Sequence, residues 1–172
     1  DVGSGKTMVA AAACFCAIQN GHQAAFMAPT EILAEQHAQS LSRLFSPLGI
    51  HVTLLTGSMT AAQKRAAKSA ITSGAAQLII GTHALFTREL QFHDLALVVC
   101  DEQHRFGVAQ RAALSAKGNT PHLLVMSATP IPRTLALIAY GDLDVSVISE
   151  LPPGRLPVET FLIGEDKRKR LN

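Results

Sequence analysis

The stretch Asp1-Val2-Gly3-Ser4-Gly5-Lys6-Thr7 decides how the rest of the chain is interpreted. Gly5-Lys6-Thr7 matches the end of the phosphate-binding loop G-x-x-x-x-G-K-[ST], whose opening glycine would stand just before Asp1. In such loops, backbone N–H groups curl around an oxyanion at the positive end of the next helix. We therefore expect Gly3, Ser4 and Gly5 to hold the phosphates of ATP. Lys6 would reach the β- and γ-phosphates, and the Thr7 hydroxyl would ligate Mg²⁺. The alternative is a simple glycine-rich turn, which the full G-S-G-K-T string before an apolar helix disfavours.

Composition places the chain among globular proteins. It has 172 residues, of which 48% are hydrophobic and only 16% are charged. The net charge of +2 is too small to indicate a nucleic-acid partner, and it does not exclude one. The longest apolar run, 8–18, is too short to span a bilayer, so no membrane partner is expected. Cys14, Cys16 and Cys100 lie in apolar stretches, which predicts buried, reduced thiols in a cytosolic protein. The histidines show no metal-ligand spacing.

Short apolar strands alternate with helices along the chain. Strands are predicted over 23–28, 51–55, 77–80, 95–100, 122–126 and 145–148, and helices over 6–20, 31–45, 60–73, 108–116 and 131–140. The first helix is apolar on most faces and is expected to be buried. Uninterrupted apolar strands joined by helices predict an α/β fold with a mostly parallel sheet covered by helices on both faces. The strand that would precede the phosphate loop is missing from the sequence. Ligands of such sheets bind at the carboxyl ends of the strands.

An acidic pair stands at one of these strand ends. Asp101 and Glu102 directly follow the apolar run 95–100. A phosphate loop needs such a partner, because one carboxylate holds Mg²⁺ through its water shell and another orients and deprotonates the attacking water. We assign the first role to Asp101 and the second to Glu102. A capping Asp-Glu pair is the alternative, which the phosphate loop in the same chain disfavours.

Hydroxyl and glycine residues follow other strands. Ser127 and Thr129 come after the strand 122–126, where they could hydrogen-bond the acidic cluster and report the state of the γ-phosphate. Ordinary turns and caps are the alternative for such residues.

Further strand ends could contact a nucleic-acid backbone, because hydroxyls, backbone N–H groups and helix N-termini suit phosphate oxygens. The candidate DNA-binding residues are Thr30, Gly57, Thr82 and His83. Taken singly, each of them fits an ordinary cap or turn better than a DNA contact, and only their order along the chain favours the DNA contact.

The order of these strings resembles that of the motifs of superfamily 2 helicases. Gly3–Thr7, Ala28–Glu31, Gly81–His83, Asp101–His104 and Ser127–Thr129 are similar to motifs I, Ia, Ib, II and III. The longer strings 28–37, 101–108 and 127–134 resemble the RecG family of branch-migration helicases. The transcription-repair coupling translocases are the alternative; they share the strings after motifs II and III but typically have Glu where this chain has Gln103.

The resemblance implies a RecA-like P-loop NTPase fold and a cytoplasmic, monomeric, ATP- and Mg²⁺-dependent translocase on double-stranded DNA. Such proteins remodel stalled replication forks and migrate branched DNA in recombination and repair. By this resemblance, Lys6, Asp101 and Glu102 would serve hydrolysis. Gln103 and His104 would couple hydrolysis to DNA movement. Ser127 and Thr129 would link the two sites.

The resemblance also suggests a domain division. Residues 1–151 would be the first motor lobe, truncated at its start, and 152–172 a linker and the start of a second lobe. We therefore expect the 172 residues alone to bind ATP weakly and not to hydrolyse it usefully. A non-catalytic ATP-binding module is a further alternative, which the presence of Lys6, Asp101 and Glu102 together disfavours. A metabolite kinase is disfavoured by the long spacing between Lys6 and Asp101.

Overall fold

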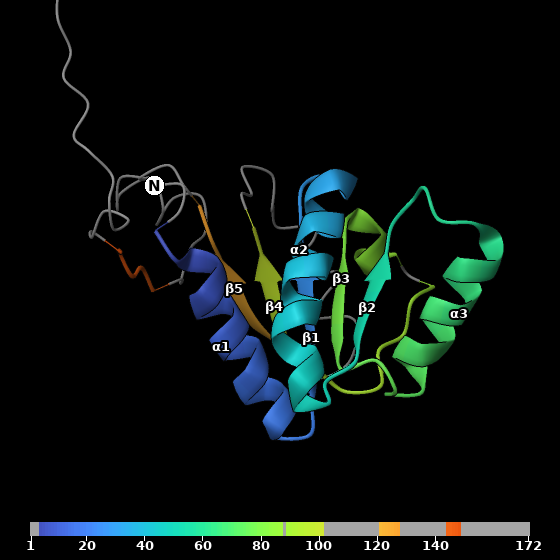
Figure 1. Cartoon of the computed structure of the whole chain (residues 1–172), viewed down its shortest axis with the longest axis horizontal. Coiled ribbons are helices and arrows are strands. Elements are labelled where there is room, and N and C mark those ends of the chain that lie inside the picture. The colour runs from blue at the N-terminus through green and yellow to red at the C-terminus, as the bar shows by residue number, and fades with distance from the viewer. Residues whose placement is uncertain (1–3, 88, 102–120, 128–143, 149–172) are drawn as a thin grey trace, which may run out of the picture.

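The computed structural model describes residues 4–87, 89–101, 121–127 and 144–148. Its described strands form a parallel sheet of five strands in the order β2-β3-β1-β4-β5 (Figure 1). The strands are β1 Gln23–Met27, β2 Val52–Leu55, β3 Leu78–Gly81, β4 Leu95–Cys100 and β5 His122–Val125. The helices are α1 Lys6–Gln19, α2 Glu31–Phe45 and α3 Ala61–Thr72, with short 3-10 helices η1 Ser46–Leu48 and η2 His83–Phe86. The predicted α/β class and parallel sheet are confirmed.

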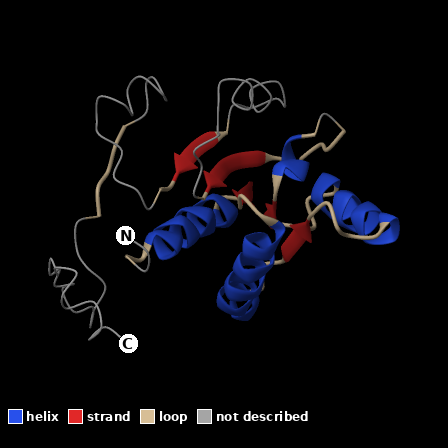
Figure 2. Cartoon of the chain, turned by 90° about the horizontal axis from the view of Figure 1, so that it is seen from above, coloured by secondary structure: helices blue, strands red, loops and turns tan. Residues whose placement is uncertain are grey.

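Helices cover both faces of the sheet, as predicted. Alternate residues of β1 separate the two cores: Phe26 packs with α1 and α2, whereas Met27 packs with α3 and η2. Figure 2 shows α1 and α2 together on one side of the sheet. The central strands β1, β3 and β4 are buried almost throughout. Their uninterrupted apolar sequences reflect this two-sided burial.

The helices begin and end close to where the sequence predicts. Thr30 caps α2 by accepting a hydrogen bond from the N–H of Leu33 at 3.3 Å. Thr60 and Gln63 form a capping box at the start of α3. Helix α1 ends before Gly21, which has a positive φ of 86° that glycine adopts readily.

The carboxyl ends of the strands and the amino ends of α1, α2 and α3 lie at one edge of the sheet, the top edge in Figure 1. This arrangement follows from the parallel pairing of the strands, since each connecting helix runs back from the end of one strand to the start of the next. We call it the carboxyl edge. Ligands of parallel α/β sheets bind at this edge.

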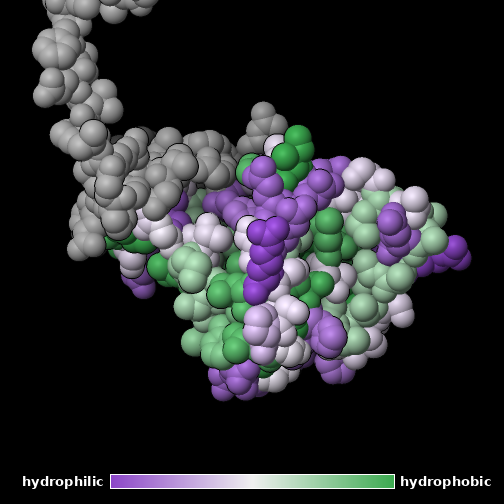
Figure 3. Space-filling model, viewed as in Figure 1, coloured by the Kyte–Doolittle hydropathy of each residue, from purple (hydrophilic) through white to green (hydrophobic). Residues whose placement is uncertain are grey.

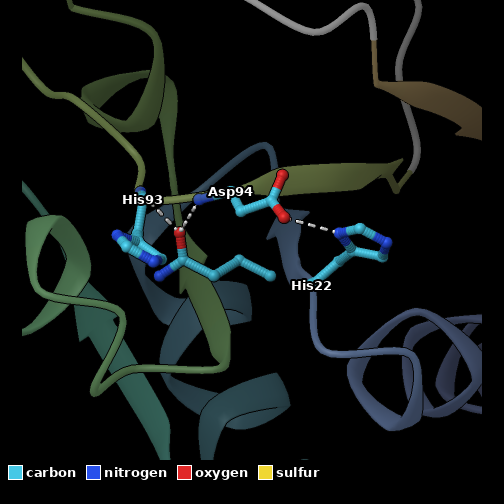
Figure 4. Close-up of polar contacts among 4 residues, drawn as sticks. His22, His93 and Asp94 are labelled. Carbon is cyan, nitrogen blue, oxygen red and sulfur yellow. Dashed lines mark hydrogen bonds and ion pairs between the residues drawn. The ribbon is translucent and has the colours of Figure 1, made fainter.

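The opposite edge is held by a buried polar residue. The Gln23 side chain donates to the carbonyl oxygens of Ile71 (2.9 Å) and Ala76 (2.7 Å). Its Oε1 accepts from the N–H groups of His93 (2.8 Å) and Asp94 (3.1 Å). Figure 4 shows His93 and Asp94 together there, with the ring of His22 facing the Asp94 carboxylate. One side chain thus joins β1, the end of α3 and the segment before β4.

Some expectations are wrong. Residues 144–148 form no regular strand and are exposed, because none of the described strands pairs with them. Helix α1 is not buried on most faces, since one side packs on the sheet and leaves Met8 and Val9 59% and 54% exposed. Cys16 lies on that outer side and is exposed, unlike Cys14 and Cys100. The predicted helices 108–116 and 131–140 lie outside the described residues.

Hydropathy gives one further finding. Among the described residues, no helix combines the length and the apolar character that crossing a bilayer requires.

Candidate active site

The amino end of α1 has features that suit an anion. Gly5 caps this 14-residue helix in a left-handed conformation with φ 85°, and it has no side chain that could hydrogen-bond the N–H groups of the first turn. No acidic residue stands in that turn. The carbonyl oxygen of Gly5 already accepts from the N–H groups of Met8 (2.9 Å) and Val9 (3.2 Å). The first turn therefore offers N–H groups and the positive end of the helix dipole to a phosphate.

Lys6 lies over this loop. Its Nζ donates to Oγ of Ser4 at 3.1 Å, and both residues are half-buried. The lysine charge is thus held beside the same N–H groups that a phosphate would contact. Thr7, also half-buried, follows in the first turn of α1.

Asp101 is the first residue after β4. Its side chain lies on the face of the sheet that α1 and α2 cover. Its N–H donates to the carbonyl oxygen of Met27 at 2.9 Å, which continues the parallel ladder between β1 and β4. Side chains alternate along β4, so Asp101 follows Leu97 and Val99, which pack in the core beneath α1 and α2. The carboxylate is therefore on the side of the sheet that carries the phosphate loop.

A histidine of α2 contacts this carboxylate. His37 Nε2 lies 2.8 Å from Asp101 Oδ2, and both side chains are only 14% exposed. The His37 ring also packs on Phe26 of β1, with ring centroids 4.7 Å apart. Because a carboxylate only accepts hydrogen bonds, the N–H at Nε2 of His37 is the donor.

These residues fit a magnesium–nucleotide complex. Mg²⁺ prefers oxygen ligands and is usually held by one or two protein groups, waters and substrate phosphates. Thr7 offers a hydroxyl from α1, and Asp101 offers the carboxylate oxygen that His37 leaves unoccupied. Among the described residues there is no cluster of three or more His, Cys, Asp or Glu that would form an all-protein metal site.

The loop after β2 is tied to the start of α2. The Glu31 carboxylate accepts from the N–H of Ser58 at 3.1 Å, and Lys64 Nζ donates to the carbonyl oxygen of Gly57. The pKa of Glu31 is lowered, first by the hydrogen bond with the Ser58 side chain and further by backbone N–H groups and Lys64. A Cβ at position 57 would lie 2.8 Å from the Glu31 carboxylate. Gly57 thus lets the loop approach α2 closely.

Thr82 and His83 follow β3 at the same edge. Thr82 precedes η2 in an extended conformation, and His83, its first residue, is exposed. Gly81 leaves no room for a side chain, since a Cβ there would overlap the carbonyl oxygen of Leu55. The backbone of β3 therefore ends tightly against β2.

The structure places the described candidates in two groups along the carboxyl edge. The nucleotide candidates follow β4 and β5 or begin α1: Ser4, Gly5, Lys6, Thr7, Asp101 and Ser127. The DNA candidates follow β1, β2 and β3: Thr30, Gly57, Thr82 and His83. The remaining candidates lie outside the described residues: Gly3, Glu102, Gln103, His104 and Thr129.

No motif of the sequence predicts a role for His37. One feature indicates that this residue has a buried partner: His37 stands within the buried stripe of α2, between Ala34 and Leu41. A polar side chain in that stripe needs a partner beneath the helix.

Comparisons with known proteins agree with this geometry. Residues 1–138 match the family model described as DEAD/DEAH box helicase. The chain is 58% identical over 172 residues to the ATP-dependent DNA helicase RecG of Escherichia coli K12, and 55% identical over 175 residues to that of Haemophilus influenzae. These alignments cover 98% and 99% of the chain but 25% of each relative.

A solved structure of RecG bound to a three-way DNA junction is also similar. It matches with a TM-score of 0.84 and 49% identity, over 99% of this chain and 23% of that one. The chain therefore spans about a quarter of the length of these relatives.

Proposed function

The chain belongs to the DEAD/DEAH box helicase family, and on that premise we propose that it forms the first, ATP-binding motor lobe of a RecG-type DNA translocase. One observation carries the proposal: the Lys6 loop and the Asp101 carboxylate lie at the carboxyl edge, on the same face of the sheet. The identity of 58% to the Escherichia coli relative, spread over nearly the whole chain, supports the RecG type.

In this proposal, the amide groups around Gly5 and the ammonium of Lys6 bind the phosphates of ATP. Thr7 and Asp101 hold Mg²⁺, which when bound neutralises charge on the phosphates. Glu102 orients the attacking water and accepts its proton. Gln103, His104, Ser127 and Thr129 transmit the state of the nucleotide to the DNA contacts.

The proposed substrate is branched or forked double-stranded DNA. The similar RecG structure is bound to a three-way DNA junction, which supports this assignment. Thr30, Gly57, Thr82 and His83 would contact the phosphate backbone from the carboxyl edge. Such contacts bind DNA without reading its sequence, as a translocase requires. We further propose that the protein acts as a monomer in the cytoplasm.

Two substitutions in the full-length protein test the hydrolytic roles. Lys6→Ala should abolish nucleotide binding and ATP turnover. Glu102→Gln should retain binding but lower turnover by a factor of about 100 or more, the scale of a lost general base. Lys68→Ala is a matched control, since this lysine lies on α3 and pairs with the exposed Glu89. Normal ATP turnover in Glu102→Gln would contradict the role of Glu102.

We also propose that the 172 residues alone bind ATP weakly and turn over little of it. The relatives are about four times longer, and hydrolysis in two-lobed motors needs groups from both lobes. Robust DNA-stimulated turnover by this chain alone would contradict that expectation.

A further inference from the structure

We propose that His37 is a positioning residue that orients the Asp101 carboxylate for the magnesium–nucleotide complex. The inference rests on the proposed function and adds to it a residue of α2 outside the phosphate loop and the acidic pair. His37 would not contact the nucleotide. It would act only through the hydrogen bond from its Nε2.

The contact is short and sheltered. The separation of 2.8 Å between Nε2 and Oδ2 and the low exposure of both side chains mean that water competes little for the bond. With Oδ2 engaged, rotation of the carboxylate is restricted. The second oxygen of Asp101 is thereby held ready for a water of the metal's shell.

The donor itself is held rigidly. The His37 ring packs on Phe26, the residue of β1 next to Met27, whose carbonyl oxygen binds the N–H of Asp101. Helix α2 is fixed at its start by the Thr30 cap and by the Glu31 contact with Ser58. Donor and acceptor are thus both built onto the ladder between β1 and β4, as an orienting outer-shell partner requires.

The chain contains a natural control for this contact. A second histidine–aspartate pair joins His22 Nδ1 to Asp94 Oδ2 at 2.7 Å, just before β4 begins (Figure 4). Asp94 and Asp101 thus flank the same strand, one at each edge of the sheet. The His22 pair is about 40% exposed and lies away from the carboxyl edge. Breaking it removes a histidine–aspartate contact of the same kind without touching the proposed metal site.

Two substitutions at His37 separate the hydrogen bond from the packing. His37→Phe keeps a ring against Phe26 but removes the donor. His37→Gln removes the ring but places an amide N–H near the position of Nε2. His22→Phe is the matched control. If His37→Phe does not fold, His37→Asn replaces it, since its shorter side chain leaves the donor out of reach.

The measurement is equilibrium binding of a fluorescent ATP analogue to the full-length protein at increasing Mg²⁺. Loss of an outer-shell partner typically weakens metal binding by about 10-fold or more. We expect His37→Phe to raise the half-saturating Mg²⁺ concentration about tenfold. His37→Gln should stay near wild type, and His22→Phe should be unchanged. Melting temperatures without nucleotide verify that each variant is folded.

The outcomes are distinct. An unchanged Mg²⁺ requirement in folded His37→Phe overturns the role of His37 while the proposed function stands. An equal rise in His37→Phe and His37→Gln also overturns it, because packing alone would then explain the effect. A wild-type protein that binds no magnesium–nucleotide overturns the proposed function itself, and the inference with it.

Discussion

Burial separates the cysteines of this chain into two kinds. Burial raises the pKa of the Cys14 and Cys100 thiols to about 12, so both stay protonated and unreactive near neutral pH. Cys16 lies on the exposed side of α1. The sequence placed all of these residues in apolar stretches, and only the packing of α1 against the sheet distinguishes them.

This difference predicts selective modification. In the native protein, a thiol reagent at neutral pH should modify Cys16 rapidly and Cys14 and Cys100 only on unfolding. Peptide mass spectrometry after short exposure measures the sites. In a Cys16→Ser variant, the fast modification within this chain should disappear. Rapid native labelling of Cys100 would contradict its burial in the sheet.

Residue types predict which groups could form the candidate site, but they do not predict the contacts between those groups. The sequence predicts Lys6, Thr7 and Asp101 as candidates, because phosphate and Mg²⁺ chemistry demands those groups in a recognisable order. It does not predict the contact between His37 and Asp101, since His37 is distant in sequence and meets Asp101 only through the packing of α2 on β1. Contacts of that kind depend on tertiary structure, which local sequence patterns do not encode.

At the scale of elements, capping residues gave the most accurate boundaries. Helices α2 and α3 begin immediately after Thr30 and Thr60, because a threonine hydroxyl satisfies a free N–H of the first turn. The strands were predicted within one or two residues by their apolar runs. The predicted strand over 145–148 failed, since the same apolar signal cannot tell whether a pairing partner is present.

The capping box of α3 can be tested directly. Thr60→Ala removes the hydroxyl that accepts from the Gln63 N–H, and it should destabilise the helix start by about 1 kcal/mol. Hydrogen exchange of the first amides of α3 measures this locally. Ser69→Ala, at an exposed position within α3, is the control and should change exchange little. Equal protection in both variants would argue against the cap.

Across the whole molecule, the two edges of the sheet have different roles. The carboxyl edge gathers the candidate ligand-binding residues, whereas the opposite edge is stabilised by Gln23. The position of these candidates at the carboxyl edge was predictable from sequence. Strands that alternate with helices run parallel, so they all end at the same edge of the sheet. The Gln23 contacts were not, because a glutamine at the start of a strand is normally exposed.

Gln23 should contribute strongly to stability. Gln23→Leu keeps the volume but removes the side-chain partner of four backbone groups, at residues 71, 76, 93 and 94. The Ile71 carbonyl keeps a hydrogen bond from the N–H of Gly74, whereas the other three groups lose this partner. At about 1–3 kcal/mol for each group left unpaired, we expect a total loss of about 3 kcal/mol. Hydrogen exchange of β1 and β4 in the full-length protein measures it. Gln39→Leu, at an exposed position of α2, is the control. A loss no larger than that of the control would contradict the account of this edge.

The central proposal is that this chain is the ATP-binding lobe of a longer motor protein that couples ATP hydrolysis to action on branched DNA. The most direct measurement is the steady-state ATPase rate of the full-length protein with and without forked DNA, at saturating ATP and Mg²⁺. We predict a rate that rises several-fold with forked DNA and vanishes in Lys6→Ala under both conditions. An ATPase rate that is the same with and without forked DNA, or that survives in Lys6→Ala, would contradict the claim.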